Sequence, residues 1–355
     1  MALRVGLVGL RGIGLQHADA YKTDPLGDMV AVCDMVKERA DSTAEKYGSR
    51  PYYSLKDMLE NEPDLDIVDV STGGPENGGW HYEPAMLAME AGKHVLVEKP
   101  LSNDILQARD MVATAARKNL HLGCNLNHFF SPTADRARQY VDEGEIGELV
   151  FCKMQMGFNG GEVENYHASG GPQIEGFPYF HLKAFLSHPL SVMRYFCGDV
   201  THVQAFCATP SFRKNAGDVM LTTASIHLKF GQGGAGYLLS QRGDANYGLG
   251  GWWSVEVGGT RGTFCIENCI ERLTYWPAHH ANEPVVMETG KTDFNETFGI
   301  RIHAFLEDVA NGVPTRETRG SGRDALAVLE YTFAIIKSYE NGGALVEPHT
   351  LPPLT

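Results

Sequence analysis

The triplet Glu98-Lys99-Pro100 holds the residues best suited to chemistry. It follows an apolar run over 94–97, which predicts a buried strand. An ionisable lysine–glutamate pair at the carboxyl end of a parallel strand lies where open α/β sheets bind their ligands. Lys99 is therefore a candidate for proton chemistry beside a bound cofactor.

A glycine-rich turn ends the first apolar run of the chain. Residues 5–14 read VGLVGLRGIG and lead directly into a helical pattern. Amide groups at such a helix N-terminus can bind a pyrophosphate, although similar turns also occur with no nucleotide. The turn departs from G-x-G-x-x-G at Arg11, which either adds charge near the pyrophosphate or is solvated. The predicted cofactor contacts in this turn are Gly9, Arg11, Gly12, Ile13 and Gly14.

Asp34 ends the second apolar run, 29–33, and lies twenty residues after Gly14. A carboxylate at this place accepts hydrogen bonds from the adenosine ribose hydroxyls and repels a 2′-phosphate. The sequence therefore predicts NAD rather than NADP as the cofactor. The alternative is an aspartate that only stabilises the turn after a strand.

Composition narrows the class of protein. The 355 residues are enough for two domains, and a net charge of −14 argues against a nucleic-acid or anionic-membrane surface. The seven cysteines include no C-x-x-C pair, so neither a disulfide framework nor a metal site is expected. With no apolar run long enough to cross a membrane, we expect a soluble cytoplasmic enzyme that works without a metal.

The order of predicted elements indicates an α/β protein. Residues 1–124 alternate strands and helices, which predicts a Rossmann dinucleotide-binding domain with about six parallel strands. Residues 125–355 contain longer runs of strand type with few helices between them. They predict an α+β domain with a large, mostly antiparallel open sheet that binds substrate. Strands at 219–226 and 236–239 carry apolar residues on both faces, which predicts a homo-oligomer, a dimer or tetramer.

Three motifs give the chain a resemblance to a known family. Residues 91–100 read AGKHVLVEKP, residues 144–147 read GEIG, and residues 255–263 read VEVGGTRGT. The chain resembles the Gfo/Idh/MocA family of sugar and cyclitol oxidoreductases along nearly its whole length. The resemblance implies a Rossmann domain, a second domain whose open sheet serves substrate and oligomer contacts, and a cis peptide before Pro100.

The resemblance also implies roles for single residues. Thr72 and His81 resemble the family's T-P-N-x-x-H element with a loop four residues longer, and we expect both to border the cofactor with Glu98 and Asn125. Residues 188–198 match the family's H-x-x-D-x-x-R-Y-x-x-G pattern, so His188 takes the place of the catalytic histidine. Two family aspartates are replaced by Ala184 and Ser191. His181 and Lys183 could substitute for the first of them.

The substrate is expected to be rich in hydroxyl groups. Residues 157–181 combine amide, carboxylate and aromatic side chains, which suit a sugar, glycoside or cyclitol. The family often has an arginine near 125–128, and its absence here argues against an acidic or phosphorylated sugar. The altered catalytic helix resembles the family's glycoside 3-dehydrogenase branch. The predicted substrate contacts are Lys99, Asn127, His128, Tyr166, His181, Lys183 and His188.

These residues suggest one reaction and leave two alternatives. A secondary alcohol would give a hydride to NAD while His188, or Lys99, removes the hydroxyl proton. Lys99 would stabilise the developing negative charge, and Glu98 would hold the lysine in place. One alternative is an NAD-binding sensor or regulator without turnover. The other is an NAD-dependent glycosidase or lyase that uses transient oxidation to break a bond.

Overall fold

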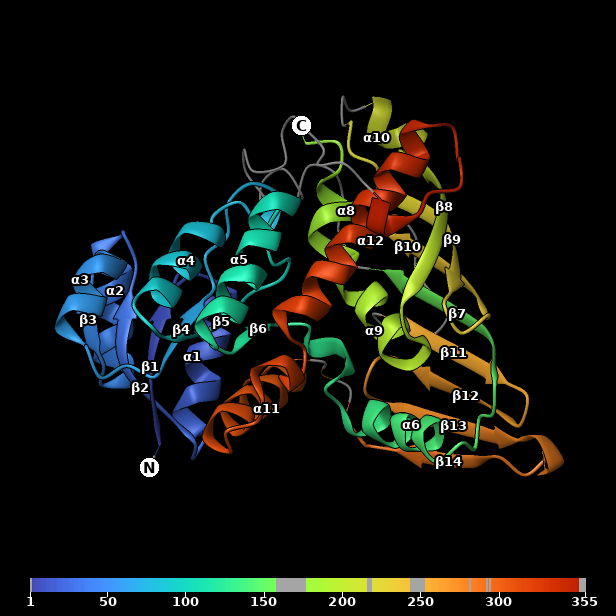
Figure 1. Cartoon of the computed structure of the whole chain (residues 1–355), viewed down its shortest axis with the longest axis horizontal. Helices are drawn as coiled ribbons and strands as arrows, with labels where there is room; N and C mark the ends of the chain where they lie inside the picture. The colour runs from blue at the N-terminus through green and yellow to red at the C-terminus, as the bar shows by residue number, and fades with distance from the viewer. Residues whose placement is uncertain are drawn as a thin grey trace. The chain divides into compact units, whose positions relative to one another are not determined.

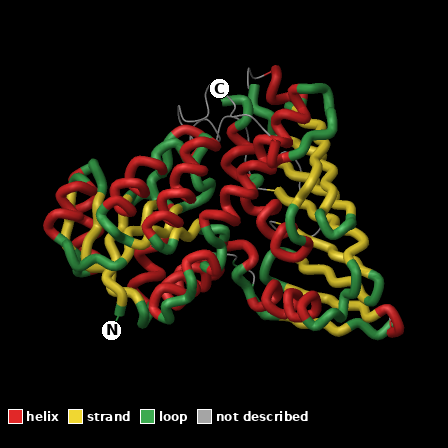
Figure 2. Tube along the Cα trace, in the orientation of Figure 1, coloured by secondary structure: helices red, strands yellow, loops and turns green. Residues whose placement is uncertain are grey.

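A computed structural model of the chain describes residues 2–157, 177–215, 219–242, 253–280, 282–291, 293 and 295–350. The chain divides into two compact units. The first unit contains residues 1–127 and 295–326, and the second contains residues 128–294 and 327–355. Figures 1 and 2 trace the elements of each unit.

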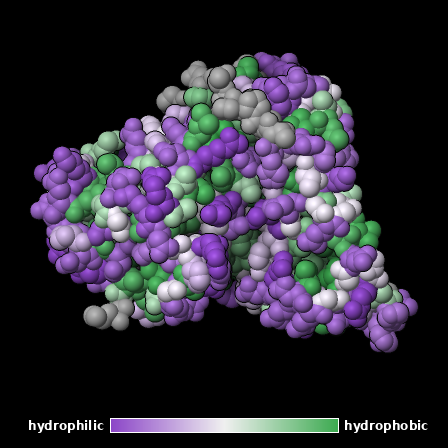
Figure 3. All heavy atoms as spheres, in the orientation of Figure 1, coloured by the Kyte–Doolittle hydropathy of each residue, from purple (hydrophilic) through white to green (hydrophobic). Residues whose placement is uncertain are grey.

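The first unit is built on a parallel sheet of six strands in the order β3-β2-β1-β4-β5-β6. This confirms the predicted Rossmann arrangement. Its strands are β1 (Leu3–Val8), β2 (Gly27–Cys33), β3 (Arg50–Tyr52), β4 (Ile67–Val70), β5 (His94–Val97) and β6 (Leu122–Cys124). Its helices are α1 (Ile13–Thr23), α2 (Lys37–Tyr47), α3 (Leu55–Asn61), α4 (Tyr82–Glu90), α5 (Ile105–Lys118) and α11 (Glu296–Ala310). Hydrophilic side chains cover most of this unit's face in Figure 3.

Helix α11 joins this unit although it comes from far along the chain. Its residues Ile302, Phe305 and Leu306 belong to the same buried cluster as Val5 and Leu7 of β1. The sequence prediction had placed this segment in the second domain. An amphipathic pattern shows that a helix buries one face, but it does not tell which sheet or helix that face covers.

The second unit contains a sheet of eight strands in the order β14-β13-β12-β11-β7-β10-β9-β8. Among the described strands of this sheet, only β7 and β10 pair in parallel, so the prediction of a mostly antiparallel sheet is confirmed. The strands are β7 (Leu149–Gly157), β8 (Val200–Ala208), β9 (Thr223–Phe230), β10 (Ala235–Gln241), β11 (Trp253–Gly259), β12 (Gly262–Glu267), β13 (Arg272–Pro277) and β14 (Val285–Glu288). The helices are α6 (Pro132–Asp142), α8 (Phe180–Phe185), α9 (Ser187–Cys197) and α10 (Ser211–Asn215). Helix α12 (Gly322–Glu340) begins in the first unit and ends in the second.

Alternation along the strands shows that one face of the second sheet is packed. In β12, buried residues alternate with half-buried ones through the whole strand, as an antiparallel sheet with one covered face requires. Helix α9 packs against β7 and β11, and α6 packs against β12 and β13. Among the residues that the structure describes, no helix is long and apolar enough to cross a membrane.

Candidate active site

The glycine turn between β1 and α1 has the close packing that a dinucleotide site needs. Gly9 adopts a φ of +92°, in the left-handed region, and a Cβ on Gly14 would lie 1.9 Å from the Gly9 oxygen. Only glycine fits at Gly14 for this reason. Arg11, Gly12 and Ile13 are exposed at the start of α1, where amide groups are free of intrahelical partners. The turn thus offers an exposed helix N-terminus that suits a pyrophosphate.

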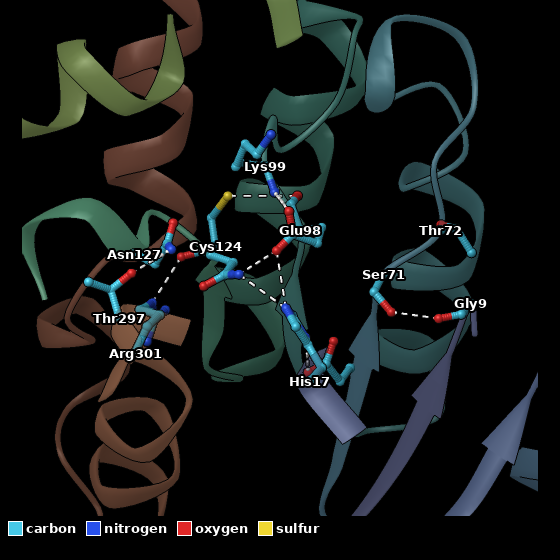
Figure 4. A network of polar contacts seen from close by, with 12 residues as sticks. Gly9, His17, Ser71, Thr72, Glu98, Lys99, Cys124, Asn127, Thr297 and Arg301 are labelled. Atoms are coloured by element: carbon cyan, nitrogen blue, oxygen red, sulfur yellow. Dashed lines mark hydrogen bonds and ion pairs between the residues drawn. The ribbon is translucent and has the colours of Figure 1, made fainter. Parts of the chain in front are cut away.

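The strand after this turn supports it. Ser71, which follows β4, donates a hydrogen bond of 2.8 Å from its hydroxyl to the Gly9 carbonyl oxygen (Figure 4). Thr72 comes next and donates its hydroxyl to the Trp80 carbonyl oxygen at 2.7 Å. The loop at 72–80 is therefore tied back on itself beside the glycine turn.

Asp34 lies at the carboxyl end of β2, next to the same turn. Its Oδ2 accepts a hydrogen bond from the Leu10 amide at 3.0 Å, and its Oδ1 accepts one from the Val36 amide at 2.9 Å. Asp34 therefore does stabilise the turn, as the alternative interpretation of this residue held. A carboxylate has about four acceptor positions, so two amide bonds leave capacity for ribose hydroxyls.

His81 supports the loops around the site from within. Its ring is fully buried, with Nδ1 2.7 Å from the Pro100 carbonyl oxygen and Nε2 against the Thr72 carbonyl oxygen. Burial lowers the pKa of His81 despite these contacts. The ring connects the loop after β4 with the loop after β5, and no face of it is left for a ligand in this arrangement.

A network of buried polar side chains lies beneath the ends of β4, β5 and β6. His17 of α1 places Nδ1 2.9 Å from Asp69 Oδ2 and Nε2 3.1 Å from Glu98 Oε1. Tyr21 donates its hydroxyl to Asp69 at 2.7 Å, and Asn125 donates its amide to the same Glu98 oxygen as His17. The network joins two of the predicted cofactor residues, Glu98 and Asn125, to α1 and β4.

Lys99 borders this network on the side of Glu98 that faces away from His17. The Lys99–Pro100 peptide is cis, as the family resemblance implied. The backbone amide of Lys99 donates to Glu98 Oε2 at 3.2 Å, and the half-buried lysine side chain points away from His17 (Figure 4). Glu98 therefore holds the lysine through its backbone.

Helix α11 contributes groups that no sequence motif indicated. Thr297 accepts a hydrogen bond of 2.8 Å from the amide of the fully buried Asn127. Arg301 donates to the carbonyl oxygen of Cys124 at 3.1 Å (Figure 4) and to that of Gly320 at 3.1 Å. These contacts position the chain after β6, which carries Asn125 and Asn127.

In the second unit, two of the predicted site residues stack. The rings of His128 and His188 lie 3.7 Å apart between centroids and 13° from parallel. His188 lies in the first turn of α9, and the ring of Trp253, from the start of β11, is 6.3 Å from His128. Stacking fixes the plane of the His188 ring.

The helix before α9 carries the other predicted histidine. The His181 Nε2 lies 3.0 Å from the Ser240 hydroxyl, and the ring is fully buried. Burial, followed by the nearby charges of Arg242 and Arg213, lowers the pKa of His181 to about 3. The imidazole is therefore neutral. Two arginines lie near this predicted site residue, although no arginine stands near 125–128.

The two departures from the family's pattern have local explanations. Ala184 is fully buried in an apolar cluster with Phe180 and Met220, where a carboxylate would lose its hydration. Ser191 donates its hydroxyl to the His188 carbonyl oxygen at 2.8 Å. Lys183 is half-buried, with its Nζ 5.3 Å from the centre of the Phe333 ring. Tyr166 lies outside the described residues.

Metal coordination has no visible basis in the described part of the chain. There, no group of three histidine, cysteine, aspartate or glutamate residues is arranged to hold a metal ion.

Two family models match the chain. One, for an oxidoreductase family with an NAD-binding Rossmann fold, matches residues 3–126. The other, for the Gfo/Idh/MocA C-terminal domain, matches residues 134–265. The chain belongs to the Gfo/Idh/MocA family.

Relatives of this Gfo/Idh/MocA protein are named as dehydrogenases of sugars and cyclitols. It is 27% identical to scyllo-inositol 2-dehydrogenase (NAD(+)) of Bacillus subtilis strain 168, over 96% of this chain and 95% of the relative. It is 34% identical to D-glucoside 3-dehydrogenase of Escherichia coli strain K12, but that match spans only 41% of either chain. An oxidoreductase from Agrobacterium radiobacter, solved with NAD+, L-tartaric acid and magnesium, has the same fold. Its TM-score is 0.85 at 19% identity, covering 98% of this chain and 99% of that one.

Sequence reasoning missed several residues of this candidate site. Asp69 could have been found, because an aspartate within the apolar strand Ile67–Val70 needs a buried partner. Trp253, Thr297 and Arg301 carried no such signal, since each reaches its contact through the tertiary fold.

Proposed function

We propose that this protein transfers a hydride between a secondary hydroxyl group of a sugar, glycoside or cyclitol and NAD. The observation that supports this best is the placement of Lys99. It follows β5, its backbone is held by Glu98, and it belongs to the same unit as a glycine turn that fits a pyrophosphate. A lysine so placed can bind the oxygen from which a proton is lost.

The cofactor would be held by groups of the first unit. The exposed amides at Arg11, Gly12 and Ile13 bind the pyrophosphate, and Asp34 accepts from the adenosine ribose. Thr72 borders the same turn, while His81 and Asn125 act through the loops and through Glu98. Bound NAD supplies the hydride acceptor.

Proton transfer would be carried out by His188 and Lys99. His188 takes the hydroxyl proton on a ring nitrogen as the hydride leaves the carbon, and Lys99 stabilises the negative charge that develops on the oxygen. The stacked ring of His128 keeps the His188 plane fixed. In the opposite direction, His188 returns the proton.

For the substrate, we propose a neutral sugar derivative, and a glycoside oxidised at C3 is the first candidate. The name of the Escherichia coli relative and the altered helix at 188–198 support this choice. Asn127, His181 and Lys183 supply polar groups near the predicted site, and Tyr166 remains a prediction.

The test is a panel of sugars, glycosides and cyclitols added to the purified protein with NAD. We expect formation of reduced nicotinamide, followed by its absorbance, and a keto sugar in the product NMR spectrum. Binding of NAD without turnover of any compound would favour the sensor alternative. A cleaved glycosidic bond would favour the NAD-dependent glycosidase or lyase.

For the assembly, we propose a homo-oligomer, a dimer or a dimer of dimers, formed through the sheet of the second unit. Phe151, Tyr237 and Leu239 lie on the face opposite the helices and are only half-buried. Light scattering at micromolar concentration should give a mass above the 38.9 kDa of one chain. A mass of one chain would exclude the proposal.

For the location of the protein in the cell, we propose the cytoplasm, because all seven cysteines are free thiols.

A further inference from the structure

His17 is the centre of the buried network in the first unit, and the mechanism above gives it no role. It lies in the second turn of α1, six residues before the end of that helix. Its ring is fully buried between Asp69 of β4 and Glu98 after β5. Figure 4 shows the ring turned toward Glu98, and the Lys99 side chain on the other side of that carboxylate.

The contacts of the His17 ring determine its protonation state. Nδ1 and Nε2 each face a carboxylate oxygen, at 2.9 and 3.1 Å. A neutral imidazole has one N–H group, and its other nitrogen would then meet an oxygen with no hydrogen between them. Both contacts are hydrogen bonds only when the ring is an imidazolium. A positive charge between two buried carboxylates also offsets the cost of removing such groups from water.

Asn125 Nδ2 also lies 3.1 Å from His17 Nε2, and with a charged ring both of these nitrogens donate to the same Glu98 oxygen. The two carboxylates beside the ring favour that charge. Burial disfavours the charged ring, but Asp69 and then Glu98 more than offset it and raise the pKa of His17 to about 10. Tyr21 of α1 donates to Asp69, and Asn125 donates to Glu98. Phe298 of α11 lies 6.0 Å from the ring. Two cations lie around this cluster. The charge of Lys99 lowers the pKa values of Glu98 and Cys124, and the charge of Arg301 lowers those of Tyr21 and Cys124.

The effect of this charge reaches Lys99 through Glu98. His17 and Asn125 hold the Oε1 oxygen, and the Lys99 amide donates to the Oε2 oxygen of the same carboxylate. Both oxygens are therefore fixed, and so is the peptide from which the lysine side chain starts. Burial would raise the pKa of Glu98, but the hydrogen bond and charge of His17, together with the charge of Lys99 and the hydrogen bond of Asn125, lower it overall.

We infer that His17 is a permanently protonated positioning residue, whose imidazolium holds Glu98 ionised and oriented beneath the Lys99 backbone. It touches neither substrate nor cofactor in this role. The inference rests on the proposed function only for its effect on turnover. The protonation of the ring does not depend on what the protein catalyses.

The first experiment observes the ring directly in the unmodified protein. Imidazole ¹⁵N NMR at pH 8 should show His17 with protons on both nitrogens, and the signal should persist above pH 9. The Asp69→Asn variant should lose this proton at a pH lower by at least one unit, because it removes the largest favourable charge. A neutral His17 ring at pH 8 in the unmodified protein would overturn the inference, whatever the enzyme assays show.

The second experiment measures turnover in His17→Gln against a matched control, His121→Gln. His121 is also buried in the first unit, but its ring contacts Thr318 and not the Glu98 network. We expect kcat of His17→Gln to fall about 10- to 100-fold, as for a misplaced catalytic group. Its affinity for NAD by calorimetry should stay within about threefold, and His121→Gln should keep its kcat.

A separate reading of pH profiles distinguishes positioning from stability. In Asp69→Asn, kcat should decline at high pH together with the NMR titration of His17, while the unmodified protein shows no decline there. If kcat does not follow the His17 titration, or if folded His17→Gln keeps full kcat, the positioning role is excluded. If no sugar is oxidised by the unmodified protein, the proposed function fails, but the NMR result on His17 still stands.

Discussion

Two fully buried histidines, one in each unit, differ in protonation: one is positively charged and the other is neutral. His17 has a pKa of about 10 and His181 a pKa of about 3, although burial disfavours the charged form of both. The difference comes from their neighbours, because His17 lies between carboxylates while His181 lies near Arg242 and Arg213. Burial by itself favours the neutral form, as in His181, and the two carboxylates beside His17 reverse this preference.

The same contrast separates the proposed roles of the two units. In the first unit, fixed charges hold Lys99 and suit a charged cofactor. In the second unit, the neutral His181 and the stacked rings of His128 and His188 suit hydroxyl groups and the transfer of one proton. The comparison can be tested by removing one group from each side.

The largest effect is expected from the two proposed catalytic residues. Lys99→Ala and His188→Ala should each slow hydride transfer by roughly 10²- to 10⁴-fold, the usual range for acid–base catalysis. Stopped-flow absorbance of reduced nicotinamide measures this step. NAD affinity should remain nearly unchanged in both variants.

Lys93→Ala in the first unit and His279→Ala in the exposed turn after β13 serve as controls for these changes. Both should keep the rate of the unmodified protein. Full activity in Lys99→Ala or in His188→Ala would remove that residue from the mechanism and with it the division of roles.

The second effect is a pair of opposite pH dependences of stability. The folded-state pKa of His17 is raised, so its stabilisation is complete below its usual pKa of about 6.5 and is lost as the pH rises toward 10. The folded-state pKa of His181 is lowered, so the protein loses stability as the pH falls from about 6.5 toward 3. Each slope is at most about 1.4 kcal/mol per pH unit.

Thermal unfolding across pH, compared with single variants, isolates each slope. The stability advantage of the unmodified protein over His17→Gln should shrink between pH 7 and 10. The sensitivity to acid should decrease in His181→Gln. If both variants follow the pH dependence of the unmodified protein, the opposite charge states of the two histidines are wrong.

The smallest effect concerns Asp34, a carboxylate that, unlike Asp69, is partly exposed. Calorimetry should show tighter binding of NAD than of NADP. Asp34→Asn should reduce the ratio of the NAD and NADP affinities about tenfold. The reason is that repulsion between two unit charges near a protein surface is worth about 1 kcal/mol or more. Asp28→Asn, an exposed aspartate at the start of β2, should leave the preference unchanged. Tighter binding of NADP by the unmodified protein would contradict the assignment.

The sequence was most informative where function requires a local pattern. The glycine turn and the apolar strands predicted the parallel sheet, because a strand buried on both faces must be apolar along its length. The short strand Arg50–Tyr52 carries no periodic signal in the sequence, because it has three residues and one of them is a proline. Strand β14 carries little signal either, because it is exposed along most of its length and shows little alternation.

The candidate site was predictable in part. Glu98 and Asn125 were both expected to border the cofactor, and the structure places them in one network at the ends of neighbouring parallel strands. The stacking of His128 on His188 was not expected, because sixty residues separate them and only the tertiary fold brings the rings together.

The position of α11 has a consequence for synthesis on the ribosome. The cluster around Val5 and Leu7 is completed by Ile302, Phe305 and Leu306, which are made about three hundred residues later. The amino-terminal part of the chain must therefore wait, with apolar surface uncovered, while the whole eight-stranded sheet is translated. A nascent chain halted after residue 127 should therefore be a ready substrate for chaperones.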